Sequence, residues 1–184
     1  MRTLYLVGAP GAGKSTALAQ ALARWQVEPT AVDQPVPHLD YGAGRLQLGR
    51  QRAGGFGGTD ALAMNIQPRA VEWVRSRPAR LLIGEGDRLG NRGFLDACAE
   101  VGSVDLVWLD VSPSVARRRG LERAERLGVK AQTDSWWRGR LTKVARLVGG
   151  YPHTRIDGDV ALDQVVDQLF EIVEKDSTRP TRVG

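Results

Sequence analysis

A segment near the start of the chain has the residue types and spacing of a phosphate-binding loop. From Gly8 to Ser15 it reads GAPGAGKS, which matches the pattern G-x-x-x-x-G-K-[ST] at every fixed position. Glycines allow the backbone to wrap around an anion with its N–H groups pointing inward. Lys14 can reach the outer phosphates of a nucleoside triphosphate, and the Ser15 hydroxyl can bind Mg²⁺. The motif therefore predicts that ATP and Mg²⁺ bind through Gly8, Gly11, Ala12, Gly13, Lys14, Ser15 and Thr16.

The residues around this motif supply the context that it needs. The apolar run 4–7 precedes it and predicts a buried strand, and residues 15–25 follow with apolar side chains at helical spacing. Such a helix directs the positive end of its dipole toward a bound phosphate. A glycine-rich turn with a surface lysine is the alternative, but it leaves the strand-loop-helix placement unexplained.

Two carboxylates follow a second apolar run. Residues 80–84 contain the sequence Leu-Leu-Ile, and Glu85 and Asp87 come directly afterwards. Carboxylates beside a phosphate loop can bind Mg²⁺, directly or through water, and can accept a proton from an attacking hydroxyl. The residues leave open which carboxylate serves the metal and which the proton, and a solvated turn is the alternative to both.

The chain is basic, with a formal net charge of +5, and all but four of its 26 basic residues are arginine. Arginine binds phosphate through two parallel hydrogen bonds, so this composition suits an anionic substrate. A genome rich in G and C would also raise the arginine count. The densest group lies in a predicted helix that starts near Ser112, and it comprises Arg117, Arg118, Arg119 and Arg123.

Length and composition limit the classes to which the chain could belong. Its 184 residues suit one domain with a sizeable core. No apolar stretch approaches the ~20 residues of a membrane span, and the first residues do not resemble a signal peptide. The single cysteine, Cys98, cannot form an internal disulfide and is expected to be a packing residue. We therefore expect a cytoplasmic protein that does not enter a membrane.

Strand-like and helix-like segments alternate along the chain. This order predicts an α/β fold with a mostly parallel five-stranded sheet flanked by helices, and ligands at the carboxyl ends of its strands. We expect a single domain over residues 1–176 and a flexible tail over 177–184. The segment from Gln34 to Gly58 is predicted to be irregular, because it combines two prolines with a glycine cluster. The predicted strands are 4–7, 30–33, 80–84, 104–111 and 153–157.

With these elements placed, the chain resembles small P-loop kinases of the adenylate and thymidylate kinase type. Glu85 stands where such kinases close a strand with an acidic residue, and Asp87-Arg88 resembles the Asp-Arg pair of thymidylate kinases. Residues 117–140 resemble their arginine-rich lid, including the run Arg138-Gly139-Arg140-Leu141 that starts the helix behind it. The catalytic residues that the resemblance implies are Lys14, Glu85, Asp87, Arg119, Arg123 and Arg140. It also places Arg119 and Gly158 against the nucleotide.

The resemblance assigns the acceptor to an insertion over residues 34–68. Gly58-Thr59-Asp60-Ala61-Leu62 is similar to the stretch that opens the acceptor-binding helices of adenylate kinases, although the order differs. Ala63 or Met64 stands where those kinases have an arginine. The implied acceptor is a nucleoside monophosphate or a nucleoside. The residues expected to contact it are Asp60, Arg88, Arg45 and Arg50.

A second resemblance concerns residues 50–68. This segment is similar to one in phage-encoded kinases, some of which phosphorylate 5-hydroxymethyluracil within DNA. It implies DNA as an alternative acceptor and the host cytoplasm as the location. A P-loop switch protein is an alternative of another class. The chain has no guanine-specificity motif of the Asn-Lys-x-Asp type, and its arginine-rich lid favours a kinase. The oligomeric state stays open.

Overall fold

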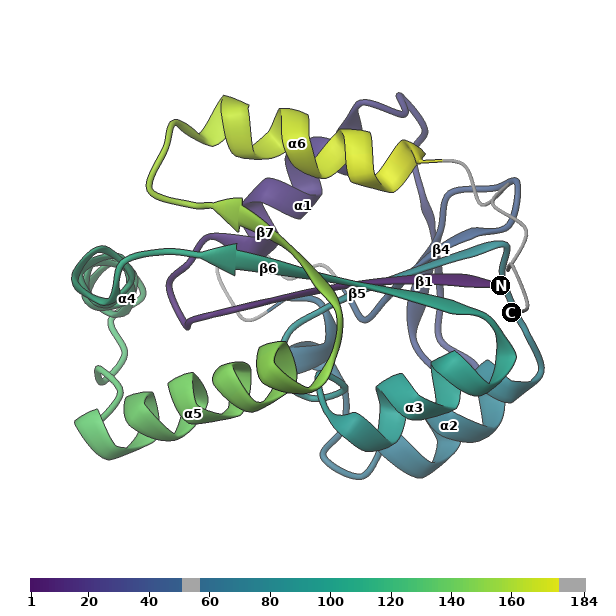
Figure 1. Ribbon diagram of the computed structural model, residues 1–184, viewed down its shortest axis with the longest axis horizontal. Helices are drawn as coiled ribbons and strands as arrows, with labels where there is room; N and C mark the ends of the chain where they lie inside the picture. The colour runs from purple at the N-terminus through teal and green to yellow at the C-terminus, as the bar shows by residue number, and fades with distance from the viewer. Residues whose placement is uncertain (51–56, 176–184) are drawn as a thin grey trace.

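The protein is built around one twisted sheet with helices on both faces (Figure 1). The computed structural model describes residues 1–50 and 57–175. In this part of the chain the sheet has seven strands in the order β2-β3-β4-β5-β1-β6-β7. The strands are β1 (Arg2–Gly8), β2 (Thr30–Val32), β3 (His38–Asp40), β4 (Arg45–Leu48), β5 (Leu81–Glu85), β6 (Ser103–Asp110) and β7 (His153–Asp157). The expected tail, 177–184, lies outside the described residues.

The sheet has two strands more than the sequence predicts. Both extra strands, β3 and β4, lie in the segment from Gln34 that was predicted to be irregular, and they form an antiparallel pair. Their turn passes through Gly42 and Gly44, which adopt φ angles of 74° and 69° that favour glycine. β4 pairs in parallel with β5. The strand predicted at 30–33 is β2, which pairs antiparallel with β3 at the edge of the sheet.

The helices form a layer on each side of the sheet. They are α1 (Lys14–Ala23), α2 (Gln67–Arg75), α3 (Arg92–Val101), α4 (Pro113–Arg126), α5 (Asp134–Gly150) and α6 (Leu162–Glu174), with a short 3-10 turn η1 at Thr59–Ala61. Figure 1 shows α1 and α6 above the sheet and α2, α3 and α5 below it. A hydrophobic core lies on each face of the sheet: the first core includes side chains of α1 and α6, and the second includes side chains of α2 and α3. Successive residues of β1 point to opposite faces, so Leu4 and Leu6 belong to the first core, and Tyr5 and Val7 belong to the second.

The second core contains the chain's only cysteine. The Cys98 side chain on α3 is fully buried beside Phe94 and Leu95. Burial raises the pKa of its thiol to about 11, so the thiol stays protonated and unreactive near neutral pH. Within the described residues, no helix is long and apolar enough to cross a membrane.

The parallel strands place several loops at one edge of the sheet. β1 lies between β5 and β6, and its Leu6 is in register with Glu85 at the end of β5. The loop that follows Gly8 therefore starts beside Glu85, although the two residues lie far apart in the sequence. The turn from β6 into α4 opens at the same edge, so three chain segments converge there.

Candidate active site

The phosphate-loop motif forms the turn between β1 and α1. Gly11 and Gly13 have φ angles of 84° and 91°, in the left-handed region that side chains other than glycine rarely adopt. A β-carbon on Gly11 would overlap the backbone carbonyl of Ala116, so the tip of the loop packs directly against α4. The glycines therefore serve both the turn itself and the close approach of the helix.

Lys14 lies at the first position of α1 and folds back over the loop. Its ammonium donates hydrogen bonds to the carbonyls of Gly8, at 2.9 Å, and Ala9, at 3.0 Å. Burial lowers the pKa of Lys14, while the negative charges of Glu85 and Asp60 act in the opposite direction. The cation is thus held at the mouth of the loop.

Glu85 meets Ser15 across the gap between β5 and α1. The Ser15 hydroxyl donates a 2.9 Å hydrogen bond to Glu85 Oε1. Glu85 is only 3% exposed, and burial raises the pKa of its carboxyl, opposed by Lys14 and by the hydrogen bond from Ser15. A hydroxyl and a carboxylate oxygen side by side fit Mg²⁺, a hard cation that takes few protein ligands and completes its shell with phosphates and water.

The segment around Gly58 covers Glu85. A β-carbon on Gly58 would overlap Glu85 Oε1, and the backbone there has a φ of 59° and a ψ of −142°. The Thr59 hydroxyl donates to the Glu85 carbonyl at 2.9 Å, and the Tyr5 hydroxyl donates to the Gly86 carbonyl at 3.0 Å. These contacts fix the end of β5 in place.

Gly58→Ala is therefore expected to damage the site, whereas Gly57→Ala should not. The first change adds a methyl group against the Glu85 carboxylate at a strained φ, which costs about 1–3 kcal/mol of stability. Displacement of Glu85 should lower turnover by ~10²-fold. A β-carbon on Gly57 meets only the Arg50 carbonyl, at an ordinary 3.6 Å. Thermal melting and turnover of both variants check the prediction, and equal behaviour of the two would contradict it.

Asp87 is surrounded by cations from α5. Its two carboxylate oxygens form ion pairs with Arg140 and with Lys143, the latter at 2.8 Å. Lys143 also donates to the Asp87 backbone carbonyl at 2.6 Å. Lys143 was not a candidate from the sequence, and its only signal was a position three residues after Arg140 on the same helix face.

Asp60 holds the loop that carries Asp87 and Arg88. Its Oδ1 accepts hydrogen bonds from the backbone N–H groups of Asp87, at 2.8 Å, and Arg88, at 3.1 Å. The Arg88 guanidinium contacts the sulfur of Met64. Met64, one of the two positions where adenylate kinases would have an arginine, is thus in contact with an arginine from the loop after β5.

One cleft of about 920 Å³ brings most of the candidate residues together. It extends from the phosphate loop, past the ends of β5 and η1, to α4 and α5. The candidates that line it are Gly8, Gly11, Gly13, Lys14, Ser15, Thr16, Asp60, Glu85, Asp87, Arg88, Arg119, Arg123 and Arg140. Residues that sequence reasoning missed also line it, among them Gln67, Asn91, Arg126 and Lys143.

Four candidates lie outside the lining of this cleft. Arg45 begins β4, at the amino edge of the parallel strands, and its guanidinium lies 4.4 Å from the centre of the Trp25 ring. Arg50 pairs with Asp33 at 2.6 Å. Ala12 is buried within the loop, and the Gly158 N–H donates to the Asp110 carbonyl at 2.7 Å.

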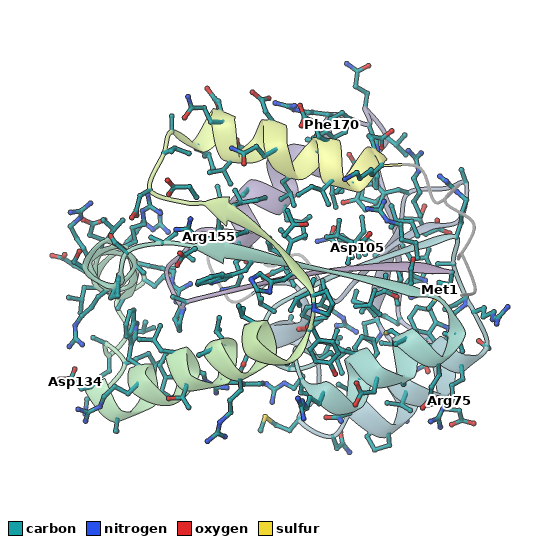
Figure 2. The ribbon with its side chains drawn as sticks, viewed as in Figure 1. Met1, Arg75, Asp105, Asp134, Arg155 and Phe170 are labelled. Carbon is teal, nitrogen blue, oxygen red and sulfur yellow. The ribbon has the colours of Figure 1, made fainter. Side chains whose placement is uncertain are left out.

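The predicted lid region, residues 117–140, covers most of α4, the connection after it and the first part of α5. Asp134, labelled in Figure 2 at the start of α5, pairs with Arg117 of α4. On α5 the Arg140 guanidinium lies 5.1 Å from the centre of the Trp136 ring, and Trp136 lines the cleft. The two helices are therefore linked to each other, and α5 is linked to the end of β5.

Comparison with known proteins identifies the family. The model of the family described as P-loop Nucleotide Kinase3 matches residues 1–175. The chain belongs to this family and is a P-loop kinase. No curated protein matches it. The resemblance to small P-loop kinases and the expected α/β fold are thus confirmed, whereas the resemblance to phage-encoded kinases stays a prediction.

Solved structures of several kinases have a similar fold. An unliganded sugar kinase from Janibacter sp. HTCC2649 has a TM-score of 0.53 at 14% identity, with 95% of this chain and 96% of the other covered. A gluconokinase from Sinorhizobium meliloti 1021 has a TM-score of 0.51 at 14% identity, over 94% and 93%. Shikimate kinase from Aquifex aeolicus has a TM-score of 0.51 at 16% identity, over 95% and 96%. At these identities the likeness shows the fold alone.

The buried carboxyl of Glu85 predicts how the stability of the kinase depends on pH. Burial raises the pKa of Glu85 in the folded state, so ionisation of this carboxyl lowers the stability of the fold. This loss of stability is absent below about pH 4.5, where the carboxyl is protonated in both the folded and the unfolded state, and it develops as the pH rises through the folded pKa. Glu85→Gln removes this loss of stability. We expect Glu85→Gln to melt at a higher temperature than the wild type at pH 7, with the difference vanishing near pH 4. Melting curves without Mg²⁺ across this range measure it, and a constant difference at every pH would contradict the assignment.

Proposed function

We propose that this kinase transfers the γ-phosphoryl group of ATP to a nucleotide-like acceptor, a nucleoside monophosphate or a nucleoside. The observation that carries the proposal is the single cleft, which joins a phosphate loop, a buried carboxylate and a set of cations from α4 and α5. Phosphoryl transfer requires mainly positioning and charge stabilisation, and these groups supply both. ATP is a cytoplasmic metabolite, so we place the reaction in the cytoplasm.

The donor phosphates would lie along the phosphate loop. Backbone N–H groups from Gly11 to Ser15 would bind them, and the Lys14 ammonium would move from the Gly8 and Ala9 carbonyls to the phosphate oxygens. The Ser15 hydroxyl and, through water, the Glu85 carboxylate would hold Mg²⁺. When bound, Mg²⁺ neutralises charge on the phosphates and aligns them for in-line transfer.

The acceptor would enter on the side of the cleft opposite α1. Glu85 would accept the proton of an attacking hydroxyl. Arg119, Arg123 and Arg140 line the cleft from the lid and would neutralise the transferred group while excluding water. In this proposal Asp87 is not the base, because both of its oxygens are paired with cations.

Arg88 would contact the acceptor, and Asp60 would support it. Arg88 lines the cleft beside Met64. It can therefore supply the positive charge that adenylate kinases have from an arginine at the position of Ala63 or Met64. Asp60 would act mainly through the loop that it holds. Since Arg45 and Arg50 lie outside the cleft lining, they have no part in the proposal.

A screen of acceptors tests the proposal. ADP release would be followed with deoxynucleoside monophosphates, nucleosides, gluconate, shikimate and DNA that carries hydroxymethylated pyrimidines. We expect the highest kcat/KM with a monophosphate or a nucleoside. Turnover with single-stranded DNA would favour the DNA alternative if its affinity depends steeply on salt. Each phosphate contact would contribute a slope of about −0.7 in a plot of log affinity against log salt concentration. Turnover with the sugar acids alone would overturn the proposal.

A further inference from the structure

Asp87 and two cations of α5 form a network at the mouth of the cleft. Asp87 follows the end of β5, and Arg140 and Lys143 lie one turn apart on α5, so one carboxylate links two elements separated by more than fifty residues. Lys143 makes two contacts with Asp87, 2.8 Å to the carboxylate and 2.6 Å to the backbone carbonyl. The network joins the lid region to the strand that carries Glu85.

The members of the network are shielded from water to a similar degree. The side chains of Asp87 and Lys143 are each 32% exposed, and that of Arg140 is 37% exposed. Burial lowers the pKa of Lys143, as do the positive charges of Arg140 and Arg88, whereas Asp60 raises it. Ion pairs at this depth and in a network are worth more than isolated surface pairs.

We propose that Asp87 and Lys143 are positioning residues, which hold α5 over the cleft so that Arg140 faces the transferred phosphoryl group. Asp87 is two residues from Glu85, which contacts Ser15 of the phosphate loop. Arg140 is therefore held close to the point where donor and acceptor meet. Lys143 ties the next turn of α5 to the same loop and prevents Arg140 from swinging away with the helix. This proposal rests on the proposed function only for the role of Arg140 in transfer.

The alternative for Asp87 is a general base that acts on the acceptor. The two roles differ in what happens when Lys143 is changed. A base would lose its function in Asp87→Asn but would keep it when a neighbouring lysine is replaced. A positioning pair should give similar losses from either side, and the double variant should lose no more than either single one.

The first experiment measures α5 itself and needs no substrate. Hydrogen–deuterium exchange of the amides from Arg138 to Val148 would be compared in the wild type, Asp87→Asn and Lys143→Met. We expect faster exchange over α5 in both variants. Arg146→Met is the matched control, because it removes one exposed cation from the same helix. Wild-type exchange rates in both variants would overturn the proposal.

The second experiment measures turnover with the best acceptor from the screen. We expect Asp87→Asn and Lys143→Met each to lower kcat by about 10²-fold with little change in the KM for ATP, because Arg140 is misplaced while the phosphate loop is intact. Lys143→Arg should restore most of the rate, and Arg146→Met should be like the wild type. A large loss in Asp87→Asn with none in Lys143→Met would show a base and contradict the positioning role. Circular dichroism establishes that each variant is folded.

The two experiments separate this inference from the proposed function. If no acceptor supports turnover, the proposed function fails, and the exchange rates of α5 still decide whether Asp87 and Lys143 hold the helix. If transfer occurs but α5 exchanges equally in all variants, the positioning role fails and the kinase reaction stands.

Discussion

Replacement of Lys14 by Met is expected to lower phosphoryl transfer by about 10²–10³-fold, the size of effect seen when one preorganised charge-stabilising donor is removed. Lys14 is the one lysine of the phosphate loop, and its ammonium lies 2.9 Å from the Gly8 carbonyl at the mouth of the cleft. Methionine keeps most of the length of the side chain but loses the positive charge. The charge that develops on the donor phosphates would then have one fewer cation beside it.

The fold should survive this change. Lys14→Met removes two hydrogen bonds to backbone carbonyls, while the glycines that set the turn and the packing of Gly11 against α4 remain. Circular dichroism and initial rates of ADP release check both halves of the prediction. Lys175→Met, at an exposed position directly after α6 and outside the cleft lining, is the control for the loss of one lysine. Wild-type turnover in a folded Lys14→Met protein would contradict the assignment of the phosphate loop.

The second large effect is expected for Glu85→Gln. Glutamine has the same shape but can neither accept a proton nor bring a negative charge to Mg²⁺, and loss of a general base commonly lowers a rate by ~10²–10⁴-fold. Since Glu85 is buried and bonded to Ser15, no neighbouring carboxylate can take its place without rebuilding the end of β5. Initial rates at saturating ATP and acceptor measure the loss.

The cause of this loss can be separated from misfolding. Glu85→Gln should melt at or above the wild-type temperature at neutral pH, because the cost of a buried charge is removed. Asp96→Asn on α3 is a suitable control, since Asp96 bonds to Tyr151 away from the cleft. An unchanged rate in Glu85→Gln would remove this residue from the mechanism, and a rate lost together with the fold would make its role structural.

The central part of the fold could be predicted because its strands are apolar. β1 and β5 are buried along their whole length, so their sequences are largely hydrophobic runs, and β6 has a buried apolar centre. β3 and β4 were missed because polar side chains interrupt them. His38 is buried with its Nδ1 2.7 Å from the Val36 carbonyl, and Gln47 accepts a 2.9 Å hydrogen bond from the Tyr41 hydroxyl. Such partners become visible only in three dimensions.

Candidate site residues could be predicted where a local sequence motif determines their position. They could not be predicted where the packing of distant elements determines it. The phosphate loop and the end of β5 fix Lys14 and Glu85 by local sequence. Arg45 has a suitable residue type, but its place at the start of β4 puts it at the edge of the sheet opposite the cleft. Lys143 was overlooked among many arginines, because its importance comes from the docking of α5 onto Asp87. Gly58 likewise derives its role from lying over Glu85.

The most direct test of the proposed function follows the phosphoryl group itself. The kinase would be incubated with ATP labelled at the γ-phosphate, Mg²⁺ and deoxynucleoside monophosphates or nucleosides, and the products separated. Our account predicts that the label appears in the acceptor, with far less in inorganic phosphate, and that Lys14→Met lowers the rate of label transfer by about 10²–10³-fold. Release of all the label as inorganic phosphate, at a rate that no acceptor changes, would instead show a nucleotide-hydrolysing switch and contradict the account.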